Sequence, residues 1–211
     1  MRLTLDGVAI GEGPGAPLPR LDATATSDTP AVVAVETEGA PTLASLIAGG
    51  RMAPDTGRVL IDGVDDPARI REVFALIDTP TVAEPFADLT VRTVVQEELA
   101  LAGQRGNRAT SDLFLEAVGL AEHDETRIKH LPTEARIRIL CELALLRPGV
   151  EGLIITTPER HGGDTAAWFG VVRDLALRHV AVLLVTGVAA AAHVSALLPA
   201  PETVSESQDT E

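Results

Sequence analysis

The feature that most constrains the fold is an alternation of short apolar runs with segments that carry helical spacing. Apolar runs typical of strands occupy residues 31–35, 58–62, 73–77, 152–156 and 180–185. Helical spacing of apolar residues occurs at 42–48, through most of 90–120, and at 133–146, 165–178 and 188–198. This alternation predicts an α/β domain in which a mostly parallel sheet is covered by helices.

A further strand pattern at residues 3–10 leads into a stretch rich in glycine and proline at 11–17. Glycines in such a loop could bind phosphate through free main-chain N–H groups. Glu12, Pro14 and Pro17 argue against this, because a carboxylate repels phosphate and proline has no N–H. We interpret the stretch as a turn.

Charge and aromatic content limit the ligands of the chain. Its 211 residues suffice for one α/β domain, and the formal net charge is −14. A surface this acidic repels phosphate backbones, so nucleic-acid binding is not expected. Aromatic residues make up 2% and tyrosine is absent, which leaves few surfaces on which an adenine ring could stack.

The sequence favours a cytoplasmic protein. Cys141 is the single cysteine, and no N-terminal signal peptide is recognisable. Residues 180–198 are apolar, but Gly187 and His193 favour a buried strand followed by a helix over a membrane span. Residues 201–211 are predicted to form a disordered acidic tail.

The order of these segments resembles the ATPase domain of ATP-binding-cassette (ABC) transporters over residues 1–200. Residues 42–49 and 53–63 are similar to the helix after the family's phosphate loop and to the strand turn beyond it. Residues 87–101 and 117–120 look like the start and the end of its helical subdomain. The resemblance implies a P-loop NTPase-like fold with a small helical subdomain at about residues 88–135.

The resemblance also implies where the nucleotide-binding motifs should fall. The phosphate loop (Walker A) corresponds to Gly39, Ala40, Pro41 and Thr42, with Ala40 at the lysine position and Pro41 at the hydroxyl position. The Walker B carboxylates correspond to Thr156 and Thr157, and the switch histidine to Gly187. The signature segment corresponds to Leu131, Pro132, Thr133 and Glu134.

Walker A and Walker B are both degenerate in this alignment. A phosphate loop needs a lysine and a magnesium-binding hydroxyl, but the single lysine of the chain is Lys129, just before the signature segment. Glu36 and Glu38 would place negative charge against the phosphates. Neither Thr156 nor Thr157 can act as a general base at neutral pH or supply the charge that magnesium prefers.

The remaining nucleotide contacts are altered as well. No glutamine occurs at residues 78–81, where the family carries the residue that senses the nucleotide. In the signature segment, Pro132 removes an N–H donor and Glu134 adds repulsion. Losses at every site together favour a pseudoenzyme.

Other chemically suggestive residues are interpreted as structural. His161 and His193 could be proposed as substitutes for the switch histidine, but an exposed or satisfied histidine is commoner. Cys141 has the spacing of a core residue. A metal site could be drawn from five residues, which we interpret as a solvated charged face: His123, Asp124, Glu125, His130 and Asp164.

The leading hypothesis is a non-hydrolysing ABC-type subunit without a cofactor, acting as a regulatory or scaffolding partner. The implied partner is a membrane-embedded transporter subunit or another ABC ATPase subunit, so the protein would lie at the inner face of the membrane through that partner. A homodimer is left open. The alternative is an ABC transporter ATPase subunit that binds ATP and magnesium weakly or works in an asymmetric pair. A GTPase-like relative ranks last, because the chain lacks an Asn-Lys-x-Asp base reader.

Overall fold

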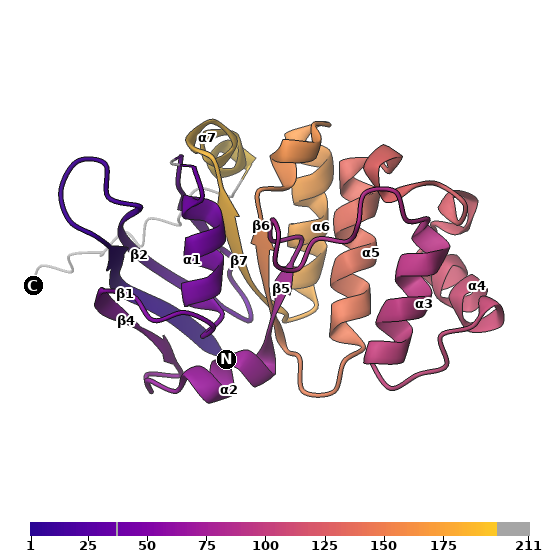
Figure 1. The fold of residues 1–211 in the computed structure, drawn as a ribbon, viewed down its shortest axis with the longest axis horizontal. Helices are drawn as coiled ribbons and strands as arrows, with labels where there is room; N and C mark the ends of the chain where they lie inside the picture. Colours follow the sequence, from indigo (N-terminus) through magenta and orange to yellow (C-terminus); the bar gives the residue numbers. More distant parts are fainter. Residues whose placement is uncertain (37, 198–211) are drawn as a thin grey trace, which may run out of the picture.

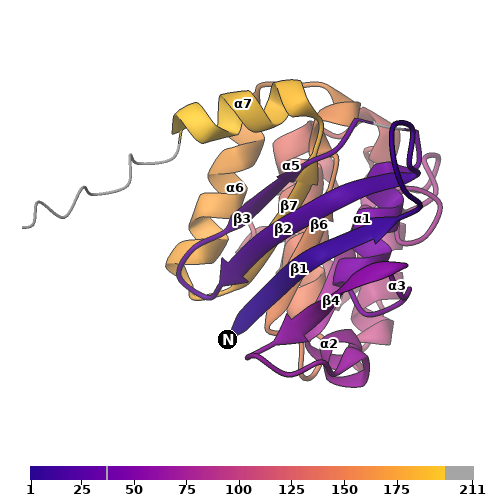
Figure 2. The ribbon, with the colours of Figure 1, turned by 90° about the vertical axis from the view of Figure 1, so that its left-hand side faces the viewer.

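The computed structural model, which describes residues 1–36 and 38–197, contains two β-sheets (Figure 1). The first is antiparallel, with strand order β2-β1-β4. Its strands are β1 (Arg2–Ile10), β2 (Leu18–Thr26) and β4 (Thr56–Ile61). Figure 2 views the molecule from the side of this sheet.

Strand β1 is the centre of the antiparallel sheet and pairs with both neighbours. Leu3 lies opposite Ala25 on β2 and Ile61 on β4, and all three side chains are buried. Gly57 has a φ of 77°, and a Cβ atom there would lie 2.3 Å from the carbonyl oxygen of Gly7. Only glycine therefore allows β4 to approach β1 this closely.

The second sheet is parallel, with strand order β3-β7-β6-β5. Its strands are β3 (Ala31–Ala34), β5 (Phe74–Ile77), β6 (Gly152–Thr156) and β7 (Ala181–Thr186). Every residue of β5, β6 and β7 is buried, as is typical of parallel strands covered on both faces. Because the strands are parallel, their carboxyl ends share one edge.

Helix α1 (Ala40–Ala48) lies between the two sheets (Figure 1). Its buried residues Ala40, Ala44 and Ile47 share one hydrophobic cluster with Leu3 of β1 and Val185 of β7. Helix α2 (Pro67–Val73) is capped by Asp66, whose side chain accepts a hydrogen bond from the N–H of Arg69, and leads directly into β5.

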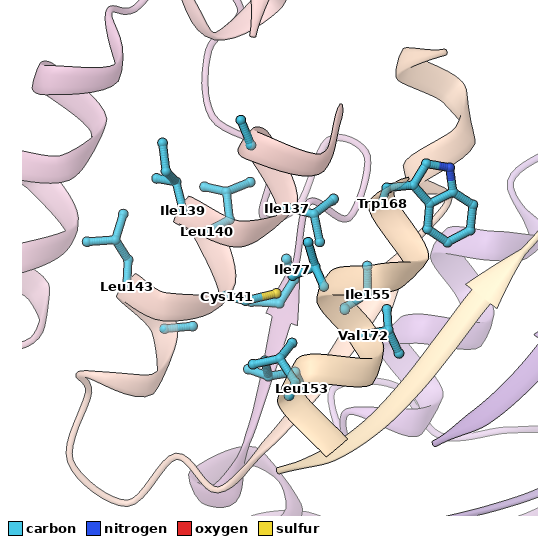
Figure 3. Packing of buried hydrophobic residues seen from close by; sticks show 14 of the residues in the cluster. Ile77, Ile137, Ile139, Leu140, Cys141, Leu143, Leu153, Ile155, Trp168 and Val172 are labelled. Atoms are coloured by element: carbon cyan, nitrogen blue, oxygen red, sulfur yellow. The ribbon is translucent and has the colours of Figure 1, made fainter. Parts of the chain in front are cut away.

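Helices α5 (Thr133–Leu145) and α6 (Thr165–Leu177) cover the other face of the parallel sheet. Figure 3 shows Cys141 of α5 among Ile77, Leu153 and Ile155 of the sheet, with Trp168 and Val172 of α6 nearby. Helix α7 (Val188–Leu197) follows β7 directly.

A group of short helices extends this side of the molecule (Figure 1). It contains α3 (Val91–Leu101), α4 (Arg108–Ala117) and the 3-10 turns η1 (Ala121–His123) and η2 (Ile128–His130). Another 3-10 turn, η3 (Pro158–His161), follows β6. The group lies within residues 88–135, whose status as a separate subdomain stays a prediction.

The predicted α/β architecture with a parallel sheet is confirmed. Strand β2 and helix α2 were not predicted, because β2 mixes polar residues into a weak alternation and α2 has only seven residues. The apolar stretch at 180–198 contains strand β7 followed by helix α7, as predicted, and no helix in the described residues is long and apolar enough to cross a membrane. The tail predicted at 201–211 lies outside the described residues.

Candidate functional site

The predicted motif positions lie along the carboxyl-terminal edge of the parallel sheet. Glu36 follows β3, Gly187 follows β7, Thr157 follows β6 and Asp78 follows β5. Ligands of open α/β sheets bind outside the carboxyl ends of the strands. The fold therefore brings the phosphate-loop, Walker B and switch positions to the edge at which a ligand would bind.

Three buried hydroxyl groups form a network at the first Walker B position. Thr156 Oγ1 lies 2.7 Å from Ser45 Oγ on α1 and 2.8 Å from Thr79 Oγ1 after β5. All three residues are fully buried. Because each hydroxyl can donate one hydrogen bond and accept others, the network is satisfied without any charge.

The second Walker B position has a strained main chain. Thr157 has a φ of 43°, in the left-handed region that β-branched residues avoid. Its N–H donates to the carbonyl of Val185 at 2.7 Å, which ties the end of β6 to β7. The same residue begins η3, which carries Arg160 and His161 toward β5.

The phosphate-loop positions are largely absorbed into helix α1. Gly39 has a φ of 80° and caps the helix without a side-chain hydrogen bond, while Ala40 is fully buried in the core. Pro41 lies in the first turn and has no N–H to donate. Thr42, which follows Pro41, is half-buried.

Two carboxylates occupy the N-terminus of α7. The N–H of Gly187 donates to Glu159 Oε1 at 2.7 Å, and the N–H of Val188 donates to Glu36 Oε1. A Cβ atom on Gly187 would lie 3.2 Å from Glu36 Oε1 and 3.4 Å from Glu159 Oε1. The protein's own carboxylates thus occupy helix N-terminal donors that could otherwise bind an anion.

A buried ion cluster lies at the end of β5. Asp78 is fully buried and accepts from Arg136 Nε at 2.9 Å and from Arg136 Nη2 at 2.6 Å. His161 Nε2 lies 2.7 Å from Asp78 Oδ2, and Arg160 Nη2 lies 3.1 Å from Oδ1. Burial by itself raises the pKa of Asp78, but hydrogen bonds from His161 and Arg136 and the nearby arginine charges outweigh burial and lower it.

This cluster was missed by the sequence analysis, which noted only the absence of glutamine at residues 78–81. An aspartate directly after a buried strand, together with an arginine on the apolar face of the helix at 133–146, was the available signal. Sequence spacing could not show that the two side chains meet.

The signature segment packs against η3. Thr133 is buried, and its Oγ1 donates to the carbonyl of Gly162 at 2.8 Å. Leu131 is buried, Pro132 caps α5 without a side-chain hydrogen bond, and Glu134 is half-buried. The start of α5 is therefore held against the end of η3.

No protein-family model matches the chain, and no curated protein matches it either. Solved structures do match. An ATP-binding subunit of an ABC transporter is 19% identical with a TM-score of 0.58, covering 92% of this chain and 82% of its own. The protein cbiO1 from Clostridium perfringens, part of the ABC transporter complex cbiONQ, is 13% identical with a TM-score of 0.59, covering 88% of this chain and 78% of its own.

The chain has an ABC-ATPase-like fold. Identity this low shows the fold alone, so the roles of individual residues stay predictions.

The residues considered for a metal site have separate roles in this ABC-ATPase-like fold. Asp124 and Glu125 form ion pairs with Arg92 of α3, whereas Asp164 accepts from the N–H of Ala167 and caps α6. Cys141 is confirmed as a core residue, and burial raises the pKa of its thiol.

Proposed function

We propose that this chain is a non-hydrolysing ABC-ATPase-like subunit that acts as a regulatory or scaffolding partner. The observation that carries the proposal is the pair of carboxylates, Glu36 and Glu159, on the first N–H groups of α7. In the resemblance, Glu36 would place negative charge against the phosphates, and Gly187 stands at the switch position. Both carboxylates therefore lie where the fold would hold nucleotide phosphates.

Charge repulsion supports this proposal. A triphosphate at this edge would meet two carboxylates without a phosphate-loop lysine, since Ala40 is buried in the core. Like charges at contact distance in a partly buried site cost several kcal/mol, by an estimate on the order of 4 kcal/mol at 4 Å. The two glutamates would have to leave α7 before phosphates could replace them.

The hydroxyl network at Thr156 supports the absence of hydrolysis. Magnesium prefers charged oxygen ligands, and the three hydroxyls there already satisfy one another. Neither Thr156 nor Thr157 can polarise an attacking water as a carboxylate does.

The ion cluster at Asp78 supports a scaffolding role. It joins the end of β5, helix α5 and η3 through the side chains of Asp78, Arg136 and His161. Arg136 Nη1 also donates to the carbonyl of Ile128, which connects the short-helix region to the same cluster at 3.3 Å. The protein's own side chains therefore hold these elements together, as a scaffolding subunit requires.

The alternative is weak ATP binding, as one half of an asymmetric pair. Arg160 favours it, because its side chain is 23% exposed beside the edge and would supply positive charge if it turned from Asp78 and Glu84 toward a phosphate. A titration of the protein with nucleotide distinguishes the two proposals.

The test is an equilibrium titration with a fluorescent ATP analogue and magnesium, with thermal unfolding followed in parallel. A ligand that binds only the folded state must raise its stability. We expect no saturable binding and no thermal shift at about 1 mM nucleotide, where even a weak site would respond. Saturable binding together with magnesium-dependent hydrolysis would overturn the proposal.

A charge-matched pair of variants tests the role of the glutamates. The double substitution Glu36→Gln and Glu159→Gln removes both carboxylates, whereas Glu116→Gln with Glu122→Gln removes two exposed ones elsewhere. If repulsion excludes the nucleotide, binding should strengthen in the first double variant and stay unchanged in the second.

The partner proposal rests on the structural neighbours, which are an ATP-binding subunit of an ABC transporter and part of an ABC transporter complex. We propose that a helix of a membrane-embedded transporter subunit docks beside Phe86, whose side chain is 82% exposed at a cavity of about 370 Å³. The apolar lining of this cavity includes Val82, Ala83 and Leu89.

Photo-crosslinking in cells tests this contact. Phe86 is replaced by benzoyl-phenylalanine, and Leu177 of α6, which is also 82% exposed, serves as the control position. A membrane-embedded subunit crosslinked from position 86 and not from 177 is the expected product. A second copy of this chain as the sole product would instead indicate a homodimer.

A further inference from the structure

A group of arginines lies away from the sheet edge, where α1 ends. Arg51, Arg58 and Arg71 line a cavity of about 480 Å³ that also includes residues of α1, β4 and α2. Three of its apolar lining residues, Ile47, Val59 and Ile70, belong to the buried core, whereas Met52 is 36% exposed. Asp65 is the single acidic residue in its lining.

Main-chain carbonyls hold two of these guanidinium groups. Arg51 Nη1 donates to the carbonyl of Gly49 at 2.7 Å, and Arg71 Nη1 donates to the carbonyl of Gly50 at 2.6 Å. Arg51 also donates to the carbonyl of Phe74 at 3.3 Å. Because Gly49 and Gly50 are consecutive, the two guanidinium groups are bound next to each other.

These carbonyls orient the arginines without neutralising them. Among residues 1–36 and 38–197, neither Arg51 nor Arg71 has a carboxylate partner, whereas Arg58 Nε pairs with Asp6 Oδ2 at 3.2 Å. The chain has 31 acidic residues and a net charge of −14, so uncompensated positive charge in one place is unusual for it. Burial, together with the charges of Arg71 and Arg147, lowers the pKa of Arg51, which shows that like charges gather there.

Gly50 allows the turn after α1 to approach α2 closely. Its φ is 66°, and a Cβ atom there would lie 2.7 Å from the carbonyl oxygen of Pro67. The turn after α1 is thus packed directly against the start of α2, which carries Arg71. The arginines are therefore presented by main chain that is already in place.

We propose that this cavity binds a small organic anion, with a carboxylate or phosphate group on Arg51 and Arg71 and a compact apolar body against Met52 and Pro54. A guanidinium group matches either anion with two parallel hydrogen bonds. The volume lies in the range of small-molecule sites. A bound anion would also relieve the repulsion between the two arginines.

Calorimetric titration of the purified chain tests the proposal, with citrate as the carboxylate probe, glycerol phosphate as the phosphate probe and glycerol as the neutral control. Saturable binding of one anion and none of glycerol is expected. Arg71→Gln should weaken that binding about tenfold or more, the loss expected for a charge-assisted hydrogen bond. Arg173→Gln, which removes the same charge from an exposed position on α6, should leave binding unchanged.

Arg71→Lys separates the effect of geometry on anion binding from the effect of charge, because lysine keeps the positive charge but lacks the planar guanidinium group. Circular dichroism and thermal unfolding without ligand establish that each variant folds. Absence of saturable binding for both anions at about 10 mM would overturn the proposal, as would equal weakening in Arg71→Gln and Arg173→Gln. ATP is itself an anion, so an ATP signal abolished by Arg71→Gln would belong to this cavity and would leave the proposal for the sheet edge untouched.

Discussion

Asp78 and Arg136 form a buried ion pair with two hydrogen bonds, at 2.9 and 2.6 Å, and neither side chain is more than 3% exposed. Asp78 stands where β5 ends, and Arg136 lies on the buried face of α5. The pair therefore fixes the signature segment relative to the parallel sheet. Burying the two charges costs desolvation free energy, and their mutual attraction offsets this cost only while both side chains are present.

Removing Arg136 should destabilise the protein strongly. We expect Arg136→Met to cost about 3–5 kcal/mol in the free energy of unfolding, because it leaves the Asp78 carboxylate buried with one partner fewer. Arg138→Met is the matched control on the same helix, since Arg138 pairs with Asp174 at 33% and 52% side-chain exposure. The control should cost about 1 kcal/mol or less. Urea unfolding measures both, and equal costs would contradict a structural role for the pair.

Stability should fall in acid because of Asp78. Its pKa in the folded protein is lowered, so the carboxylate contributes stability above its unfolded value of about 3.9 and loses it as pH falls toward the folded value. Urea unfolding between about pH 5 and pH 3 should show this loss. The pH dependence should be shallower in Asp78→Asn, which has no carboxylate to protonate. An unchanged slope would mean that other carboxylates dominate.

The hydroxyl network at Thr156 should contribute to stability. Thr156→Val leaves Ser45 and Thr79 without this shared partner, at a cost of about 1–3 kcal/mol. Thr186 is an apt control, because it also ends a strand fully buried and its Oγ1 has no hydrogen-bond partner among the described residues. Thr186→Val should be neutral or stabilising, as measured by thermal unfolding. A larger loss at position 186 than at 156 would refute the network.

The thiol of Cys141 should be unreactive in the folded protein. It is fully buried among apolar side chains (Figure 3), and burial raises its pKa, so the nucleophilic thiolate is scarce. A chromogenic disulfide reagent should modify it only in denaturant. Rapid modification in native buffer would show that the core around α5 opens readily.

The sequence predicted elements where the apolar pattern is strong and long. The buried runs at 152–156 and 180–185 became β6 and β7, because strands covered on both faces consist of little but apolar residues. Strand β2 was not predicted, because its polar residues interrupt the alternation of apolar and polar side chains. Its conformation depends on pairing with β1. Helix α2 is too short for a periodic signal, although Asp66 and Pro67 mark its start.

Through the resemblance to ABC ATPases, the sequence by itself predicted which chemical groups the candidate site lacks: a phosphate-loop lysine at position 40, carboxylates at 156 and 157, and a histidine at 187. Only the tertiary structure decided what stands in their place. The carboxylates of Glu36 and Glu159 meet at α7 from different loops, and Asp78 meets Arg136 across 58 residues of chain. The identity of a residue can be read from the sequence at a single position. Contacts between distant residues depend on the order of the strands in the sheet, because that order decides which loops lie side by side at its edge.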